Sequence, residues 1–396
     1  VIIIAGSSKG TKDYTSTAIG MLGEILVHGV ATRPGKPTIL GIIDHKPIVG
    51  IPGYPVSVYL ALEWFVRPLL YRYWGLPEPE RATISAVLGR RIVSEPGVEE
   101  FIRVAVGFIN GRFIANPLGR GAGLTMSLVK ADGLLVIPAN SLGCEEGTMA
   151  EIQLYRTERE LKNSVVVMGS HDPALDLLGE ELREISPGLK LSSSHVGSMG
   201  GITAVWKGLA HLAGVHLLDT ATGEYNIPFI KRLLGDEPLV LVNLAYRIQG
   251  WMVPPGNPCK IQTVTDLLQK DLRFINRQRG AGTRMLLDFL LAKGGIKGDQ
   301  IYGYQREEYS HLNVAAAIAA GTADVGLGIY SAAQSFGLDF IPVGEERYDL
   351  LMLKDFYDSS LGKAVIQAIT SRQFQEKVET LGGYSLRHTG RVIYEQ

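Results

Sequence analysis

The sequence predicts an α/β protein with a β-rich segment in its middle. Strand-like and helix-like stretches alternate at both ends of the chain, and short β-like stretches fill the region between them. The 396 residues are too many for one ordinary domain, and 47 glycines suit many tight strand-to-helix turns. We therefore expect an α/β segment at 1–74, a small β-barrel or sandwich at 75–157, and a two-lobed α/β segment at 163–396.

The first segment opens on an apolar run at 1–4, which predicts a buried strand and no signal peptide. A helix is expected at 14–26, a strand pair at 37–43 and 47–50, and a second helix at 56–73. Because the run at 1–4 follows no initiator Met, we expect the chain to begin inside a domain of a longer protein.

The other two segments differ in the spacing and type of their expected elements. After a proline-rich linker, β-stretches are expected at 82–88, 100–109, 112–116, 133–137 and 149–154, with a short helix at 124–130. The last segment predicts strands at 165–168, 190–193, 239–242, 274–275 and 325–327. It also predicts helices at 174–184, 201–213, 283–293, 312–320, 331–336 and 360–369. This longer alternation suits two lobes.

Composition excludes several classes of partner. The net charge is -1, which gives no support for a nucleic-acid or membrane-surface role. No apolar run reaches the roughly 18–20 residues that span a bilayer. Cys144 and Cys259 lie far apart and form no metal-ligand pattern, so a reduced cytoplasmic setting is expected.

Three loops of the first segment carry residues suited to phosphate or oxyanion chemistry. The loop at 5–14 is rich in glycine and serine and precedes a helix, a place where backbone N–H groups bind phosphate. Asp13 in this loop is suited to a Mg²⁺ ion, or alternatively to capping the helix. In the second loop, at 28–37, prolines aim Lys36. In the third loop, at 50–57, Ser57 either donates to an oxyanion or caps a helix.

Together these loops resemble the molybdopterin-binding domain of the molybdopterin molybdenumtransferase family. The resemblance lies in Gly-Ser-Ser-x-Gly-x-x-Asp-Tyr, Arg-Pro-Gly-Lys-Pro and Pro-Gly-x-Pro-Val-Ser, in that order. It implies a partial three-layer α/β domain that binds adenylylated molybdopterin. The implied cofactor-binding residues are Gly6, Ser7, Ser8, Gly10, Arg33, Pro52 and Pro55, with Asp13 as the Mg²⁺ ligand.

The β-rich segment resembles the small C-terminal barrel of the same family, through Glu-Phe-Ile-Arg at 100–103 and the stretch 121–127. The resemblance implies that Arg103 and Ser127 hold molybdate together with Lys36 and Ser57; the alternative for Arg103 is a surface ion pair. Members of the family insert molybdate into adenylylated molybdopterin and release AMP. The resemblance also implies a homodimer. The family's usual upstream acidic metal ligands are absent here, which leaves catalysis by this chain open.

The third segment places polar residues at three strand-to-helix turns, where N–H groups, hydroxyls and guanidinium groups gather. The expected anion-binding residues are Ser170, His171, Asp172, Ser198, Arg247, Arg277, Thr283 and Arg284. His171 and His195 lack close metal-ligand spacing, so hydrogen bonding is the expected role of both. A nucleotide P-loop is disfavoured because the terminal Gly-Lys-Ser/Thr is missing.

This segment resembles the periplasmic-binding-protein-like domain of molybdate-related proteins. The matching stretches include Gly-Ser-His-Asp-Pro at 169–173, Gly-Ser-Met-Gly-Gly at 197–201 and Ala-Asp-Val-Gly-Leu-Gly at 323–328. The resemblance implies a binding domain for molybdate or tungstate. Two hypotheses follow: a molybdenumtransferase with a built-in oxyanion-binding domain, or a non-catalytic sensor or regulator. A small organic molecule is the alternative ligand.

Overall fold

A computed structural model describes residues 1–4, 14–220 and 222–396, and the chain divides into two compact units at 1–162 and 163–396. In the described residues, no helix has the length and hydropathy needed to cross a membrane.

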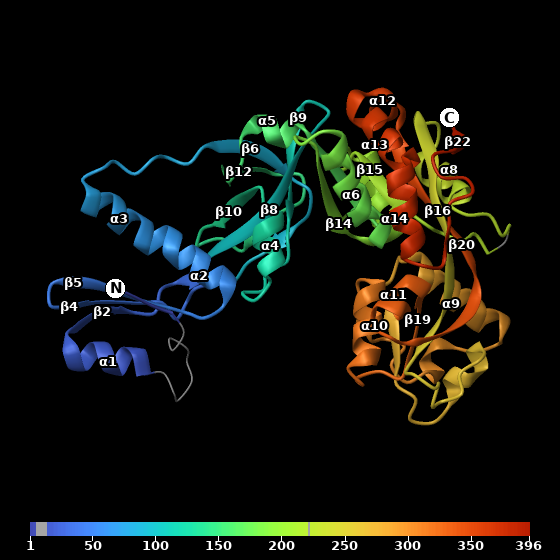
Figure 1. The fold of residues 1–396 in the computed structure, drawn as a ribbon, viewed down its shortest axis with the longest axis horizontal. Coiled ribbons are helices and arrows are strands. Elements are labelled where there is room, and N and C mark those ends of the chain that lie inside the picture. Colours follow the sequence, from blue (N-terminus) through green and yellow to red (C-terminus); the bar gives the residue numbers. More distant parts are fainter. Residues whose placement is uncertain (5–13, 221) are drawn as a thin grey trace. The chain divides into compact units, whose positions relative to one another are not determined.

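The first unit begins with a four-stranded sheet in the order β1-β5-β4-β2. Its strands are β1 (Ile2–Ile4), β2 (Glu24–His28), β4 (Ile39–Ile43) and β5 (Lys46–Ile51). Figure 1 shows α1 (Tyr14–Leu22) on one side of the sheet, and α2 (Pro55–Ala61) and α3 (Arg67–Trp74) on the other. A short π-helix, Leu62–Val66, joins α2 to α3. Ile39 and Ile51 are fully buried in this layered arrangement.

Two expectations for this region are wrong in detail. The first strand forms, but Ile2 and Ile4 are exposed, because β1 is the edge of the described sheet and pairs only with β5. The helix expected at 14–26 ends at Leu22. Gly23 packs so tightly that an added Cβ would lie 2.0 Å from the Ile42 carbonyl oxygen, and the chain then pairs as β2.

Five strands close into a small barrel in the order β10-β12-β6-β9-β8, with β8 pairing back to β10. They are β6 (Thr83–Leu88), β8 (Glu99–Ile109), β9 (Arg112–Pro117), β10 (Gly133–Ile137) and β12 (Met149–Leu154). Alternate apolar residues such as Ile102, Val104 and Val106 fill its interior. The two-residue strand β3 (Thr32–Arg33) pairs in parallel with the start of β8, so it joins the sheet of the barrel, which is separate from the four-stranded sheet.

Three short elements complete the first unit. A β-ribbon of β7 (Ile92–Val93) and β11 (Gly143–Cys144) extends beside the barrel, and α4 (Thr125–Lys130) precedes β10. Helix α5 (Glu158–Lys162) ends the unit, with Leu161 buried against the barrel core.

The second unit has one sheet that runs through two lobes, in the order β14-β13-β15-β20-β16-β19-β17-β18. The first lobe contains β13 (Ser164–Gly169), β14 (Lys190–His195) and β15 (Leu212–Val215). The second contains β17 (Phe274–Arg277), β18 (Glu307–Glu308) and β19 (Val325–Ile329). The 15-residue strands β16 (Leu239–Val253) and β20 (Asp339–Leu353) pair along their length and cross from one lobe to the other (Figure 1).

Helices cover both lobes and leave separate apolar cores. The first lobe carries α6 (Pro173–Ile185), α7 (Gly197–Trp206), α8 (Ile227–Leu234), α12 (Lys354–Asp358), α13 (Ser360–Thr370) and α14 (Arg372–Thr380). The second carries α9 (Gly282–Lys293), α10 (His311–Ala319) and α11 (Tyr330–Ser335). The terminal strands β21 (Tyr384–Ser385) and β22 (Val392–Glu395) add to β16.

The predicted architecture of layered α/β domain, small barrel and two-lobed α/β domain is confirmed, but two expectations in the last domain are wrong. The helix expected at 201–213 is α7, which ends at Trp206; the apolar residues that follow form β15, between β13 and β20. Neighbouring strands here override a helix-like pattern. No strand was expected at β20, although it is one of the two that link the lobes.

Candidate functional site

The first unit contains a pocket of about 600 Å³ where the second and third predicted loops meet the barrel segment. Its walls come from the turn that follows β3, the turn that precedes α2, and residues from 95 to 122 of the barrel segment. The predicted residues that line it are Arg33, Lys36, Pro52 and Ser57. Pro55 does not line the pocket, although it opens α2 beside it.

Lys36 and Ser57 are the polar groups best placed to meet a ligand in this pocket. Lys36 is exposed, and its ammonium forms no ion pair with any described residue. Ser57 is 3% exposed, in the first turn of α2. Pro55 occupies the first helical position, so Ser57 lies at a helix start, a place that favours anions.

Arg33, unlike Lys36, already forms an ion pair: its guanidinium lies 3.0 Å from the Glu95 carboxylate at the rim of the same pocket. Both side chains are more than half exposed. The pair is therefore weak and can exchange for a phosphate or another anion at little cost.

Arg103 and Ser127 do not line this pocket; they lie behind one of its walls. Arg103 Nε donates to Ser127 Oγ at 3.1 Å, and Nη2 donates to the Gly119 carbonyl at 2.6 Å. The Ser127 hydroxyl donates to the Leu124 carbonyl at 2.6 Å, so its proton is already engaged. These bonds hold the segment that ends at Ala122, which lines the pocket and accepts from the Val56 N–H.

One atom of Arg103 remains available. Its Nη1 has no hydrogen-bond partner among the described residues and is buried, since the side chain is only 1% exposed. Burial lowers the pKa of Arg103, an effect that nearby Tyr155 and Glu100 oppose. A buried donor without a partner is costly, so a ligand oxygen near Nη1 would relieve a real penalty.

The remaining predictions for this site concern residues that the structure does not describe. Gly6, Ser7, Ser8, Gly10 and Asp13 lie outside the described residues. Elsewhere along the described chain, no three His, Cys, Asp or Glu side chains gather as a metal site. The described residues therefore provide no ligand set for Mg²⁺.

The second unit holds a buried polar cluster where β16 and β20 pass between the lobes. Arg247 on β16 lies directly opposite Glu346 on β20 and donates to it through Nη2. Its Nη1 donates to Asp172 at 2.5 Å. All three side chains are at most 2% exposed. Burial opposes the charge on Arg247, but the two carboxylates outweigh it and raise its pKa.

Asp172 is occupied by structural partners. One carboxylate oxygen caps α6 by accepting from the Ala174 N–H at 2.7 Å, and both oxygens accept from the Tyr384 hydroxyl. An ionised carboxylate also repels an anion. The contacts of Asp172 therefore fit a role in orienting Arg247 better than contact with the ligand.

Ser170, His216 and Glu346 form a chain of hydrogen bonds in the same cluster. His216 Nδ1 lies 2.8 Å from the Glu346 carboxylate, and Nε2 lies 2.7 Å from Ser170 Oγ. Because burial lowers the pKa of His216, the ring is neutral. The carboxylate can only accept, so Nδ1 carries the proton and Ser170 donates to Nε2. Ser170 then has no proton left for an oxyanion.

Arg277 and His311 have unmet hydrogen-bonding capacity in this cluster, as do Arg247 Nε and Gln249 Oε1. Arg277 Nη1 and both ring nitrogens of His311 are buried without a partner in the described chain, and each side chain is 1% exposed. Burial, reinforced by the positive charge of Arg247, lowers the pKa of Arg277 to about 10. The same burial, with Arg277 next in importance, lowers the pKa of His311 well below its usual value.

Two helix starts complete the cluster. Ser198 near the start of α7 accepts from the His216 N–H at 3.2 Å, and Thr283 near the start of α9 accepts from Gln249 at 3.2 Å. Both hydroxyl protons remain free to donate to a ligand. The lobes meet closely here, because a Cβ on Gly282 would lie 2.1 Å from the His216 carbonyl oxygen.

Two predicted residues are less well placed. His171 lies 3.3 Å from Asp176 through Nε2 and packs against His195, with ring centroids 4.2 Å apart. Arg284 stacks on Tyr304 and lies 3.3 Å from both Asp288 and Glu307. Its charge is thus already balanced by protein groups.

The sequence-based prediction did not include four residues of the cluster: His216, Gln249, His311 and Glu346. His311 opens α10 and so had the helix-start signal used for the other turns, whereas the residues before His216 were expected to be helical and gave no such signal. Glu346 and Gln249 lie within long strands and carried no local signal. Only the pairing of β16 with β20 places them in the cluster.

Three known domains match the chain in sequence. Residues 1–72 match a probable molybdopterin binding domain, residues 85–155 the MoeA C-terminal region (domain IV), and residues 179–370 a PBP superfamily domain. These matches agree with the layered domain, the barrel and the two-lobed domain described above.

Relatives fall into two groups. The uncharacterized protein YvgK of Bacillus subtilis is 34% identical over 243 residues, which are 61% of this chain and 78% of that protein. The molybdopterin molybdenumtransferase of the same organism is 29% identical over 162 residues, 40% of this chain. The chain spans only 37% of the length of that transferase.

Among solved structures, a molybdopterin biosynthesis MoeA protein from Pyrococcus horikosii is 36% identical, with a TM-score of 0.33. That similarity covers 40% of this chain and 37% of the other. The chain therefore belongs to the family of YvgK, and it joins MoeA-like molybdopterin-binding and C-terminal domains to a PBP-like domain.

Proposed function

We propose that this chain serves molybdenum-cofactor assembly: its first unit binds molybdate beside adenylylated molybdopterin for metal insertion, and its second unit binds a small oxyanion such as molybdate or tungstate. The observation that carries the proposal is the pocket of about 600 Å³ that both Lys36 and Ser57 line. The similarity of residues 1–72 and 85–155 to molybdopterin-related domains supports the choice of ligand.

Each residue of the first unit has a definite part in this proposal. The Lys36 ammonium attracts molybdate or the phosphate of the cofactor, and the Ser57 hydroxyl donates to one of its oxygens. Arg103 does not line the pocket; it holds the wall that ends at Ala122 through hydrogen bonds to the Gly119 and Gly121 carbonyls. Arg33 exchanges Glu95 for an anionic group of the ligand. Asp13 is the residue proposed to bind Mg²⁺.

The transferase activity is tested by AMP release. The protein is incubated with adenylylated molybdopterin, Mg²⁺ and molybdate, and AMP is measured by chromatography. Molybdate-dependent AMP release, lost in Lys36→Met, is the expected result. Should AMP appear at the same rate without molybdate, or not at all, the transferase proposal fails.

The second unit is proposed to bind its oxyanion at the buried polar cluster. The unpartnered Arg277 Nη1 and His311 nitrogens, and the free protons of Ser198 and Thr283, support this assignment. Such groups cost free energy unless a ligand pairs with them. Their number suits a tetrahedral anion, which accepts hydrogen bonds in several directions.

Titration calorimetry with molybdate, tungstate, sulfate and phosphate tests this second site. We expect molybdate or tungstate to bind more tightly than the other two, and Arg277→Met to weaken that binding. The unpartnered acceptor Gln249 Oε1 favours one alternative ligand, a small organic carboxylate that also carries a hydrogen-bond donor. Flat titrations for all four anions would favour that alternative over an oxyanion.

A further inference from the structure

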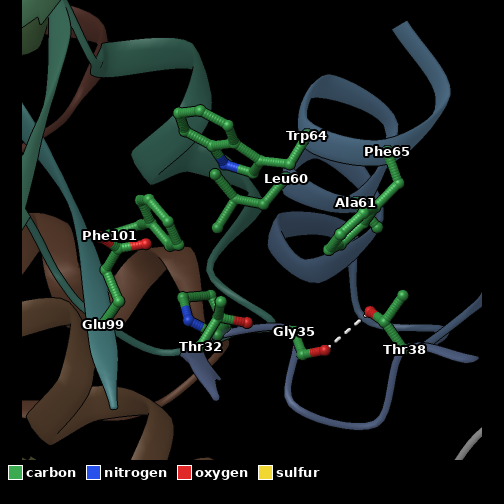
Figure 2. A pocket seen from close by; sticks show the side chains of 10 residues that line it. Thr32, Gly35, Thr38, Leu60, Ala61, Trp64, Phe65, Glu99 and Phe101 are labelled. Carbon is green, nitrogen blue, oxygen red and sulfur yellow. Dashed lines mark hydrogen bonds between the residues drawn. The ribbon is translucent and has the colours of Figure 1, made fainter. Parts of the chain in front are cut away.

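A second pocket, of about 250 Å³, lies in the first unit between the layered domain and the barrel. Figure 2 shows Trp64 and Leu60 near Phe101, with Phe65 approaching from another side. The helical segment 55–66 supplies most of these apolar groups, and β8 supplies Phe101. Binding pockets for whole small molecules measure roughly 300–1,000 Å³, so this pocket suits one rigid ring system.

The aromatic walls have a defined arrangement. Trp64 and Phe101 pack with ring centroids 5.0 Å apart and an angle of 30° between their planes. Trp64 Nε1 is buried and has no hydrogen-bond partner in the described residues. A flat ligand with a polar edge would both contact these rings and provide an acceptor for Nε1.

One carboxylate faces this aromatic surface. Glu99 and Phe101 are two residues apart on β8, so they lie on the same face of the strand, and both line the pocket. Figure 2 places the Glu99 side chain near Phe101 and Thr32. Glu99 is half-buried, and its carboxylate forms no ion pair or side-chain hydrogen bond with any described residue. Such a group is an acceptor for a ligand that carries neighbouring N–H donors.

The two pockets of the first unit adjoin, because Thr32, Pro34 and Gly35 line both. Their chemistry is opposite: the larger pocket has Lys36, Arg33 and Ser57 for an anion, whereas the smaller has aromatic rings and a carboxylate. A ligand with an anionic group at one end and a flat ring with N–H donors at the other would match both.

We propose that the smaller pocket holds the pterin ring of molybdopterin, with Glu99 accepting hydrogen bonds from the ring N–H and the adjacent amino group. This inference rests on the proposed function, which supplies the ligand, and it assigns the ring end to Trp64, Phe65, Phe101 and Glu99. Adenine fits less well, because its amino group neighbours acceptor nitrogens and it cannot give a carboxylate two adjacent donors.

The test uses the whole protein and two soluble probes, 6-hydroxymethylpterin and its phosphate ester. Calorimetry gives the affinities. Tryptophan fluorescence locates the ring, because Trp64, one of four tryptophans, lines the smaller pocket. Both pterins should quench the fluorescence, and Trp64→Phe should remove most of that quenching. Glu99→Gln should weaken both pterins about tenfold to a hundredfold, the range of a charged hydrogen bond.

Three comparisons make the result decisive. Glu151→Gln removes an exposed carboxylate of β12 that lines neither pocket, and should leave both affinities unchanged. Lys36→Met should weaken only the phosphorylated pterin. Thermal unfolding of every variant shows whether the fold is intact.

The proposal is overturned if folded Glu99→Gln binds both pterins normally, or if AMP quenches Trp64 while the pterins do not. If molybdate binds in a Lys36-dependent manner and neither pterin binds, the ring assignment fails and the proposed function stands. If the pterins bind as expected and no Lys36-dependent anion binding is found, the ring assignment is supported, and the oxyanion part of the proposed function fails.

Discussion

The larger pocket of the first unit and the buried polar cluster of the second unit offer cationic groups to an anion in two different ways. Lys36 and Arg33 stand on proline-stiffened turns with access to solvent, and neither is held by a buried partner. Arg247 and Arg277 are each 1% exposed, in a network that includes Asp172 and Glu346. The open site can change by mutation without disturbing the fold, whereas in the buried cluster Arg247 balances two buried carboxylates on which stability depends.

The strongest test of this contrast removes one arginine from each site. Arg247→Ala leaves Asp172 and Glu346 buried without their counter-ion, and should lower the free energy of unfolding of the second unit by about 3–5 kcal/mol. Arg33→Ala breaks only an exposed pair with Glu95, and should change stability by less than about 1 kcal/mol. Urea unfolding measures both. Equal effects of the two variants would show that burial is not what separates the sites.

Within the buried cluster, Arg277 should behave unlike Arg247. Arg277→Met removes a charge that has no carboxylate partner, so we expect the free energy of unfolding to stay the same or rise. Binding of the preferred oxyanion should weaken by about 1.5–3 kcal/mol, because a charged hydrogen bond is lost. Calorimetry and urea unfolding of the same variant check the two expectations. An Arg277→Met protein that binds the anion normally would remove Arg277 from the site.

The fold was largely predictable from the sequence because its signals are local. Apolar periodicity and turns located the barrel strands and most helices within a few residues, as for α9 at 282–293 against an expected 283–293. The errors arose where partners distant in sequence decide the structure. Ile2 and Ile4 look like core residues, but lie on an edge strand. Residues of β15 continue a helix-like pattern, but pair between two other strands.

The sites divide in the same way. The turns that carry Lys36 and Ser57 were recognisable, because their prolines and glycines are part of the chemistry. Glu346 was not, since it lies in a long strand and meets Arg247 across 99 residues of sequence. Glu99 was missed as well: the matched motif begins at the next residue, and only the alternation of β8 brings Glu99 and Phe101 to one face.

A pH titration sharpens the comparison from another direction. Burial lowers the pKa of both His311 and His216, so these rings are neutral where unfolded histidine, with a pKa near 6.5, begins to protonate. The second unit should therefore lose stability as pH falls below about 6.5, by up to about 1.4 kcal/mol per pH unit for each proton. His311→Gln should reduce this slope. A wild-type slope that the variant leaves unchanged would contradict the assignment to His311.

A second loss of stability is expected at lower pH, where Glu346 becomes protonated. Burial opposes the charge on Glu346, but Arg247, His216 and the hydrogen bonds it accepts lower its pKa to about 2. Its contribution to stability is complete above the unfolded value near 4.5, and is lost as pH falls toward 2. Urea unfolding of His311→Gln between pH 5 and pH 3 isolates this second loss from that of His311.

The smallest expected effect on stability belongs to Lys36. Because its ammonium is exposed and unpaired, Lys36→Met should leave the free energy of unfolding within about 0.5 kcal/mol of the wild-type value.

Molybdate binding to the first unit should nevertheless weaken several-fold at low salt. The difference from wild type should shrink as salt is added, since exposed charges are screened within about 8 Å at physiological ionic strength. Arg277→Met should show a loss of binding in the second unit that changes little with salt, because burial protects that charge from screening. Calorimetry over a salt series measures both slopes, and two parallel slopes would mean that the sites do not differ in the way their burial predicts.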